Sequence, residues 1–205
     1  WEEHMDKLLI SLPIAGTCFK KTYWDPKNQR NCSVLILPKV LVVNYFANSL
    51  DTAERITEVL TQTKRKVQEL KNLGLYLDID LGTPATIDKT LTESVVSSFQ
   101  LPDSDNDEVT PYTILEQHTY LDLDNDGYSE PYIITVELDS RKVLRIVPRF
   151  SADDILVDEK QKVVYIEATQ FYTKYSFIPN PDGGFYDIGF GRLLGPINKA
   201  SNTII

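Results

Sequence analysis

The clearest candidate for chemistry in the sequence is a short acidic run, DLDNDG at 122–127. Asp122, Asp124, Asp126 and Gly127 match the first half of a calcium loop, in which alternate carboxylate oxygens face a cation and a glycine makes the bend. The alternative is a hairpin turn between two strands, where backbone geometry alone favours Asn, Asp and Gly.

The second half of this run departs from a calcium loop. Glu130 occupies the ninth position, which can contribute a ligand, but the twelfth position, where a bidentate glutamate completes the coordination shell, is Ile133. We therefore expect a turn that needs no cofactor. A calcium-dependent binding module that uses residues 122–130, with the three aspartates and Glu130 as ligands, is kept as the alternative.

Other catalytic chemistry has little support in the residue types. The chain has two histidines, His4 and His118, and no serine or cysteine in a recognisable nucleophile context. A phosphate-binding loop of the Walker type is absent from the sequence. Carboxylates are numerous, so a hydrolase with a carboxylate pair is a third hypothesis, although no two acids stand out. We expect a protein that is not an enzyme.

Composition and charge limit the class of partner. Of the 205 residues, 42% are hydrophobic, and the formal net charge is −9. General affinity for nucleic acid is disfavoured, because binding to phosphates uses clustered Lys and Arg. No segment approaches the roughly 18 uninterrupted apolar residues of a membrane span, so we expect no membrane partner.

The first part of the chain, at 1–100, combines helices and strands. Apolar residues at helical spacing predict a helix that Pro13 and Gly16 end. β-Branched and aromatic residues predict strands at 17–24 and 34–43. Pro38 lacks an N–H group, so it either makes the second strand an edge strand or divides it.

Two further helices are expected before residue 100. Ser49 or Asp51 is expected to cap a helix over 52–73, and a second helix is expected over 87–99. Three basic residues cluster at 64–66. They form either a solvated helix face or a patch for DNA or for an acidic neighbouring subunit.

The two cysteines are expected to be free thiols. Cys18 and Cys32 flank a turn-rich segment, but a hairpin that turns near Pro26 places Cys18 closer to Leu37 than to Cys32. Free thiols are consistent with a reducing compartment.

The pattern changes after residue 100. The segment 101–111 is short, acidic and bracketed by prolines, which predicts a linker or loop. Alternating residues over 112–188 then predict an antiparallel β-meander, with hairpin turns at Asp126-Gly127 and Asp139-Ser140. Its strands are expected at 112–123, 132–138, 143–147 and 163–175. This order predicts an α+β fold.

The last segment, 189–205, predicts the start of a long helix. Its apolar residues recur at helical spacing in one stripe: Leu193, Leu194, Ile197, Ala200 and Ile204. We expect Pro196 in the first turn, where a missing N–H group is tolerated. The stripe is still running at Ile205, so we expect the helix to continue in a longer protein.

Four segments, in order, resemble the portal proteins of bacteriophages, and most closely the large portals of short-tailed phages. GFGRLLGPINKASNTII (189–205) is similar to the segment that leads into the long stem helix of that family. The other three are HMDKLLISLPIAGTCFKKTYWDP (4–26), LPKVLVVNYFANSLDTAERIT (37–57) and YLDLDNDGYSEPYIITVELDSRKVLRIVPRF (120–150). The resemblance spans nearly the whole chain and implies the wing region and the start of the stem.

The resemblance implies a structural function. Portal subunits form a ring of about twelve copies at one capsid vertex, and DNA enters and leaves through its channel. The implied partners are further copies of the chain, capsid and scaffolding proteins, the terminase and the tail adaptor proteins. DNA would pass without sequence-specific binding, and the location would be the virion, after assembly in the cytoplasm of the host bacterium. The resemblance also favours a turn at 122–127, and it places the clip and crown of the family beyond Ile205.

The resemblance implies that residues 189–205 face neighbouring subunits, and helical spacing then suggests which side chains make the contact. The expected interface has three residues that pack (Leu193, Leu194 and Ile197) and three that pair through polar groups (Arg192, Asn198 and Asn202).

Overall fold

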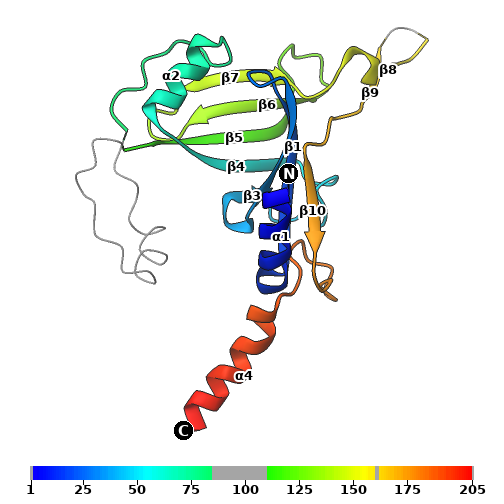
Figure 1. The fold of residues 1–205 in the computed structure, drawn as a ribbon. Helices are drawn as coiled ribbons and strands as arrows, with labels where there is room; N and C mark the ends of the chain where they lie inside the picture. The colour runs from blue at the N-terminus through cyan, green and yellow to red at the C-terminus, as the bar shows by residue number, and fades with distance from the viewer. Residues whose placement is uncertain (1, 85–109, 160–161, 205) are drawn as a thin grey trace. The chain divides into compact units, whose positions relative to one another are not determined.

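The computed structural model describes residues 2–84, 110–159 and 162–204 (Figure 1). The described residues form helices and antiparallel sheets, which confirms the expected α+β class. The chain divides into two compact units, of which the first comprises Trp1–Ile56 with Ala152–Ile205 and the second Thr57–Ser151. The expected helix at 87–99 and most of the expected linker at 101–111 lie outside the described residues.

The first unit is built on a three-stranded antiparallel sheet. Its order is β10-β1-β2, with β1 (Thr17–Asp25), β2 (Arg30–Ile36) and β10 (Tyr172–Ser176). Helix α1 (Glu2–Ala15) precedes β1 and continues past Pro13. The core of this unit draws residues from both the N-terminal and the C-terminal parts of the sequence. They are Phe19, Ile36, Leu41, Ala47, Leu50, Ala53, Ile56, Tyr172 and Phe185.

Short elements complete this unit. The 3₁₀ helix η1 (Pro38–Val40) separates β2 from β3 (Leu41–Val43), so Pro38 divides the predicted strand in two. A second 3₁₀ helix, η2 (Ala152–Asp154), precedes the two-stranded antiparallel hairpin of β8 (Ile155–Val157) and β9 (Val163–Ile166). Helix α4 (Phe190–Ile204) follows β10 and closes the described chain.

In its described residues, the second unit is a sheet with helix α2 packed on it. Its strands belong to a five-stranded sheet with the order β3-β4-β5-β6-β7, in which β4 (Arg55–Gln62) runs into this unit from the first. The other elements are α2 (Lys64–Asn72), β5 (Tyr112–Leu121), β6 (Glu130–Glu137) and β7 (Val143–Pro148). Val67 of α2 meets Ile114, Leu144 and three neighbours in the core of this unit.

The predicted cysteine geometry is confirmed. In the β1–β2 ladder, Phe19 pairs with Ile36 and Tyr23 with Cys32, so Cys18 and Cys32 are not opposite each other. Both are free thiols, and burial raises the pKa of Cys18.

Three sequence expectations are wrong. Residues 55–62 form a strand, not the first half of a helix, and Thr63 caps the helix that follows. The segment 163–175 is not one strand of a meander, since β9 pairs with β8 and β10 pairs with β1. Pro196 lies at the seventh residue of α4 and not in its first turn.

The first of these errors has a clear cause. The side chains of β4 alternate in burial, with Ile56 and Glu58 inside. Apolar residues at 56, 59 and 60 also satisfy helical spacing, and the sequence prediction followed that pattern. Sheet neighbours decided the outcome, since β4 lies between two other strands.

None of the helices in the described part of the chain combines the length and the apolar run that a membrane span requires.

Candidate functional site

The start of α4 is fixed by a contact between two glycines. Gly16, which follows α1, has a φ of +85°, and Gly189 immediately precedes α4. A Cβ atom added to Gly189 would lie 2.4 Å from the Ile14 carbonyl oxygen and 2.5 Å from the Gly16 nitrogen. Real Cβ atoms do not approach backbone this closely, so the joint between α1 and α4 requires glycine on both sides.

Asp187 connects this joint to the sheet of the first unit. Its N–H donates to Thr17 Oγ1 (2.7 Å), and its Oδ2 accepts from Ser176 Oγ (2.6 Å) and from Lys174 Nζ (2.7 Å). Its Oδ1 accepts from the Asn180 N–H at 3.2 Å. Burial raises the pKa of the Asp187 carboxyl, but the hydrogen bonds from Lys174, Ser176 and Asn180 outweigh burial and hold the pKa below its ordinary value. The carboxylate therefore stabilises the loop as an anion.

Aromatic rings pack around the same loop. Phe19 of β1 stacks on Phe185 with ring centroids 5.9 Å apart, and Lys174 Nζ lies 5.3 Å from the Phe185 centroid. Phe190, the first residue of α4, meets Phe177 edge to face at 5.1 Å. These contacts set where α4 begins.

From its first residue onward, α4 presents an exposed apolar face. Phe190, Leu193, Leu194 and Ile197 follow the i, i+3, i+4, i+7 spacing of one helix face, and their exposed fractions lie between 43% and 66%. The three residues expected to pack are therefore brought together. Phe190 was not predicted to belong to this face, although its spacing could have shown it.

The three polar residues of the predicted interface are less closely grouped. Arg192, Asn198 and Asn202 are all exposed on α4. At roughly 100° per residue, Asn198 flanks the apolar face, whereas Arg192 and Asn202 lie outside it. The structure therefore supports one apolar face on α4 better than a combined apolar and polar one.

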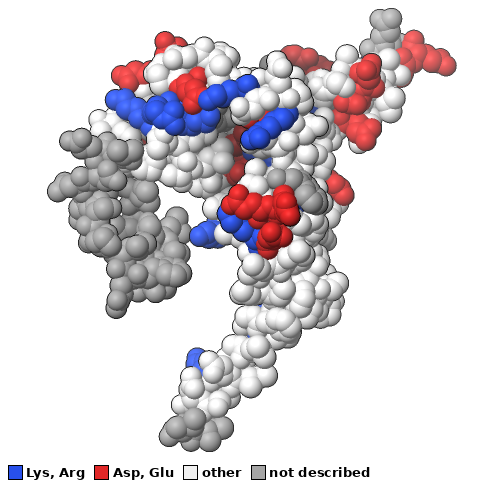
Figure 2. All heavy atoms as spheres, viewed as in Figure 1, with Lys and Arg blue, Asp and Glu red and all other residues white. Residues whose placement is uncertain are grey.

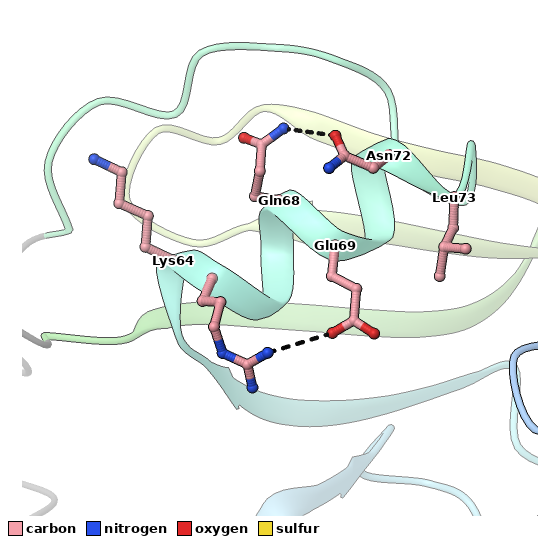
Figure 3. Close-up of a pocket in the computed structure, with 6 residues that line it drawn as sticks. Lys64, Gln68, Glu69, Asn72 and Leu73 are labelled. Carbon is pink, nitrogen blue, oxygen red and sulfur yellow. Dashed lines mark hydrogen bonds and ion pairs between the residues drawn. The ribbon is translucent and has the colours of Figure 1, made fainter.

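A second surface feature lies on α2 of the second unit. It is an open depression of about 510 Å³, lined by Lys64, Arg65, Gln68, Glu69, Asn72 and Leu73 (Figure 3). Arg65 Nη1 lies 3.8 Å from Glu69 Oε2. Glu69 supplies the single carboxylate of this lining, so the depression lacks the pair of acids that the hydrolase hypothesis requires.

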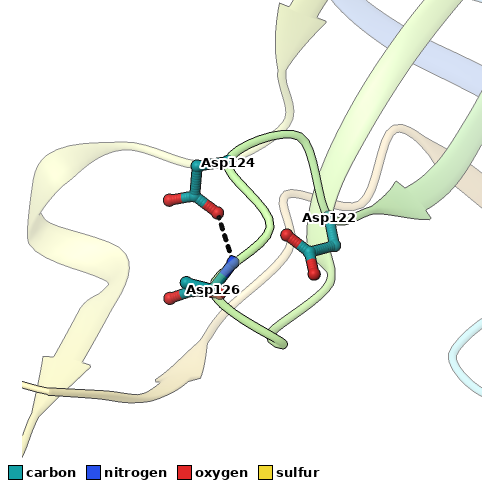
Figure 4. A group of neighbouring side chains, drawn as sticks. All are labelled: Asp122, Asp124 and Asp126. Carbon is teal, nitrogen blue, oxygen red and sulfur yellow. Dashed lines mark hydrogen bonds between the residues drawn. The ribbon is translucent and has the colours of Figure 1, made fainter.

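The acidic loop between β5 and β6 brings its three aspartates together. Carboxylate oxygens of Asp122, Asp124 and Asp126 lie within 4.8 Å of one another (Figure 4). Each carboxylate also accepts a backbone N–H from its own loop: Asp122 from Gly127 (3.0 Å), Asp124 from Asp126 (3.3 Å) and Asp126 from Tyr128 (2.7 Å). These bonds are those of a turn stabilised by its own side chains.

Glu130 is engaged elsewhere. It is the first residue of β6, and its carboxylate accepts a hydrogen bond from the Tyr132 hydroxyl. That bond, reinforced by burial, raises the pKa of Tyr132 to about 12. Within the described residues, the cluster of possible metal ligands contains the three aspartates and does not include Glu130.

Comparison with known proteins identifies no family and no relative for this chain. The chain matches no protein-family model and is not similar to any curated protein. Its function is therefore inferred from its own residues.

Proposed function

We propose that this chain is part of a subunit of a bacteriophage portal ring, the channel through which DNA enters and leaves the capsid. The observation that carries the proposal is the exposed apolar face of α4, which starts from a rigid joint. A helix with an apolar stripe along one face is stabilised mainly by packing that face against another element, so α4 needs a packing partner.

Neighbouring copies of the same helix are the partner we propose. Phe190, Leu193, Leu194 and Ile197 form a stripe of the kind that packs helix against helix. Burial of the exposed part of each such side chain contributes about 1 kcal/mol, so four side chains give several kcal/mol per subunit. The glycine joint and Asp187 hold the direction of α4 relative to the sheet of the first unit. A contact that repeats around a ring requires such a fixed direction.

The choice of a ring follows from the sequence resemblance of 189–205 and the three upstream segments to portal proteins. The partners proposed with it are copies of the chain in a ring of about twelve, capsid and scaffolding proteins, terminase and tail adaptor proteins. The net charge of −9 suits a channel through which DNA slides without sequence-specific contacts. The proposed location is the virion.

Electron microscopy and native mass spectrometry of the natural gene product that contains this sequence test the proposal. We expect closed rings with a central hole about as wide as duplex DNA, roughly 20 Å. A folded monomer that forms no rings, at any protein concentration accessible to both methods, would refute it.

A matched pair of variants tests the role of α4. Ile197→Gln places an amide in the apolar face, whereas Lys199→Gln places the same side chain roughly 200° away around the helix. We expect Ile197→Gln to destabilise the rings and Lys199→Gln to leave them intact. Equal effects of the two variants would contradict a contact through the apolar face.

A further inference from the structure

The β8–β9 hairpin of the first unit exposes apolar side chains on both strands. Leu156, Val157, Val164 and Tyr165 have exposed fractions between 52% and 61%. The hairpin is closed by its own hydrogen bonds, including Asp158 N–H to the Lys162 carbonyl at 2.9 Å. Isolated two-stranded hairpins are marginal in water, and a third element is usually needed to cover such a surface. These exposed residues therefore need a further surface to cover them.

The hairpin is also acidic. The range 153–167 contains five acidic residues and two lysines. Asp153, Glu159 and Glu167 are exposed. Acidic side chains gather over β8 and β9 (Figure 2). A partner surface for this hairpin should therefore be basic and partly apolar.

Helix α2 of the second unit has that character. Lys64, Arg65 and Lys66 occupy its first turn, and basic side chains gather over this helix (Figure 2). Glu69 lies within 4 Å of both Arg65 and Lys66, so one carboxylate is shared by two of these three cations. The half-exposed Leu73 adds an apolar patch to the depression beside them.

The position of these cations at the start of α2 is unfavourable for the helix itself. The N-terminal end of a helix carries a partial positive charge and favours acidic residues, yet the first turn of α2 has none. An external acidic surface would offset both the dipole and the three side-chain charges. The chain carries such a surface on β8 and β9.

We propose that the β8–β9 hairpin of one copy binds the α2 surface of a second copy. The two surfaces are complementary in charge, and each exposes apolar side chains beside its charged ones. They lie at different places on the chain, so the contact is head-to-tail, the type that generates rings when its rotation closes. This inference deepens the proposed portal function, since it names a contact between neighbouring subunits that is separate from α4.

Charge reversal on each side tests the contact. The first variant carries Lys64→Glu with Arg65→Glu, and the second carries Asp153→Lys with Glu159→Lys. Each creates like charges across the proposed contact, and we expect the assembly of the natural gene product, measured by mass photometry at low ionic strength, to weaken at least about tenfold. The effect should shrink at high salt because salt screens exposed charges.

Mixing the two variants provides the decisive measurement. A reversed α2 surface then meets a reversed hairpin, so attraction is restored at that contact, and we expect the mixture to assemble about as well as the unmodified protein. The control is Asp51→Lys with Glu54→Lys, which changes two exposed acids elsewhere on the first unit. Circular dichroism of each variant checks that the fold is retained.

Three outcomes would overturn this contact. They are reversals with no more effect than the control, a mixture that assembles no better than its components, and an α2 reversal that abolishes retention of DNA but leaves self-association unchanged. If Ile197→Gln dissolves rings that the reversals do not affect, the hairpin contact is wrong and the portal proposal stands. If the reversals and their mixture act as expected on an assembly that is not a ring, the contact stands and the portal proposal is wrong.

Discussion

Substitution of Gly189 by alanine should destabilise the first unit strongly, because the added methyl group has no space. Its Cβ would lie 2.4 Å from the Ile14 oxygen, 2.5 Å from the Gly16 nitrogen and 2.8 Å from the Ala15 carbonyl carbon. All three are backbone atoms, so no side-chain rotation can relieve the contact. Gly189 lacks the positive φ of Gly16, so the substitution tests close packing without added strain from a left-handed backbone.

The expected cost is large. Forcing one extra carbon into a closely packed site costs typically 1–3 kcal/mol, and contact with backbone on three sides places Gly189→Ala at about 3 kcal/mol. This corresponds to a fall of roughly 6–12 °C in the melting temperature. Both tryptophans, Trp1 and Trp24, belong to the first unit, so urea unfolding followed by tryptophan fluorescence reports on the unit that contains the joint.

Gly195→Ala is the matched control. A Cβ at Gly195 meets nothing within 4 Å, and the residue lies inside α4. Alanine should therefore favour the helix by about 0.5–1 kcal/mol, which is opposite in sign to the effect at Gly189. If Gly189→Ala unfolds at the same urea concentration as the unmodified protein, or if both variants shift together, the proposed glycine joint is wrong.

Three further predictions concern the loops. Because the folded-state pKa of Asp187 lies below that of an unfolded aspartate, its contribution to stability is present above the unfolded pKa and is lost as the pH falls through the lower folded value. Asp187→Asn should cost about 1.5–3 kcal/mol at neutral pH and flatten the acid side of the stability profile; an unchanged acid limb would contradict this. Gly127→Ala should cost about 1 kcal/mol through its φ of +90° alone, since nothing lies within 4 Å, and thermal unfolding of this variant measures it. Calcium should leave the melting temperature of the EDTA-treated protein unchanged, whereas a site filled at 100 times its Kd would add about 2.7 kcal/mol.

Local signals in the sequence predicted several elements correctly. Pro38 lacks an N–H group, so an interruption near residue 38 was one of two expected outcomes, and the DNDG turn needs only its own four residues and the strands beside it. The helix after Gly189 also follows from its own apolar spacing. The register between β1 and β2 followed from the length of a short loop, which is why the separation of Cys18 from Cys32 was predictable.

Contacts between distant segments decided what the sequence could not. Residues 55–62 satisfy both helical and strand spacing, and the strands beside β4 selected the extended form. Strand β10 joins β1 across most of the chain, and Asp187 bonds to Thr17 over a separation of 170 residues. No local pattern encodes these partners, because pairing depends on which surfaces meet after collapse. The sequence by itself determined that a helix with one apolar face begins near residue 189. The tertiary structure decided that this apolar face stays exposed and that Gly16 and Gly189 fix the direction of the helix.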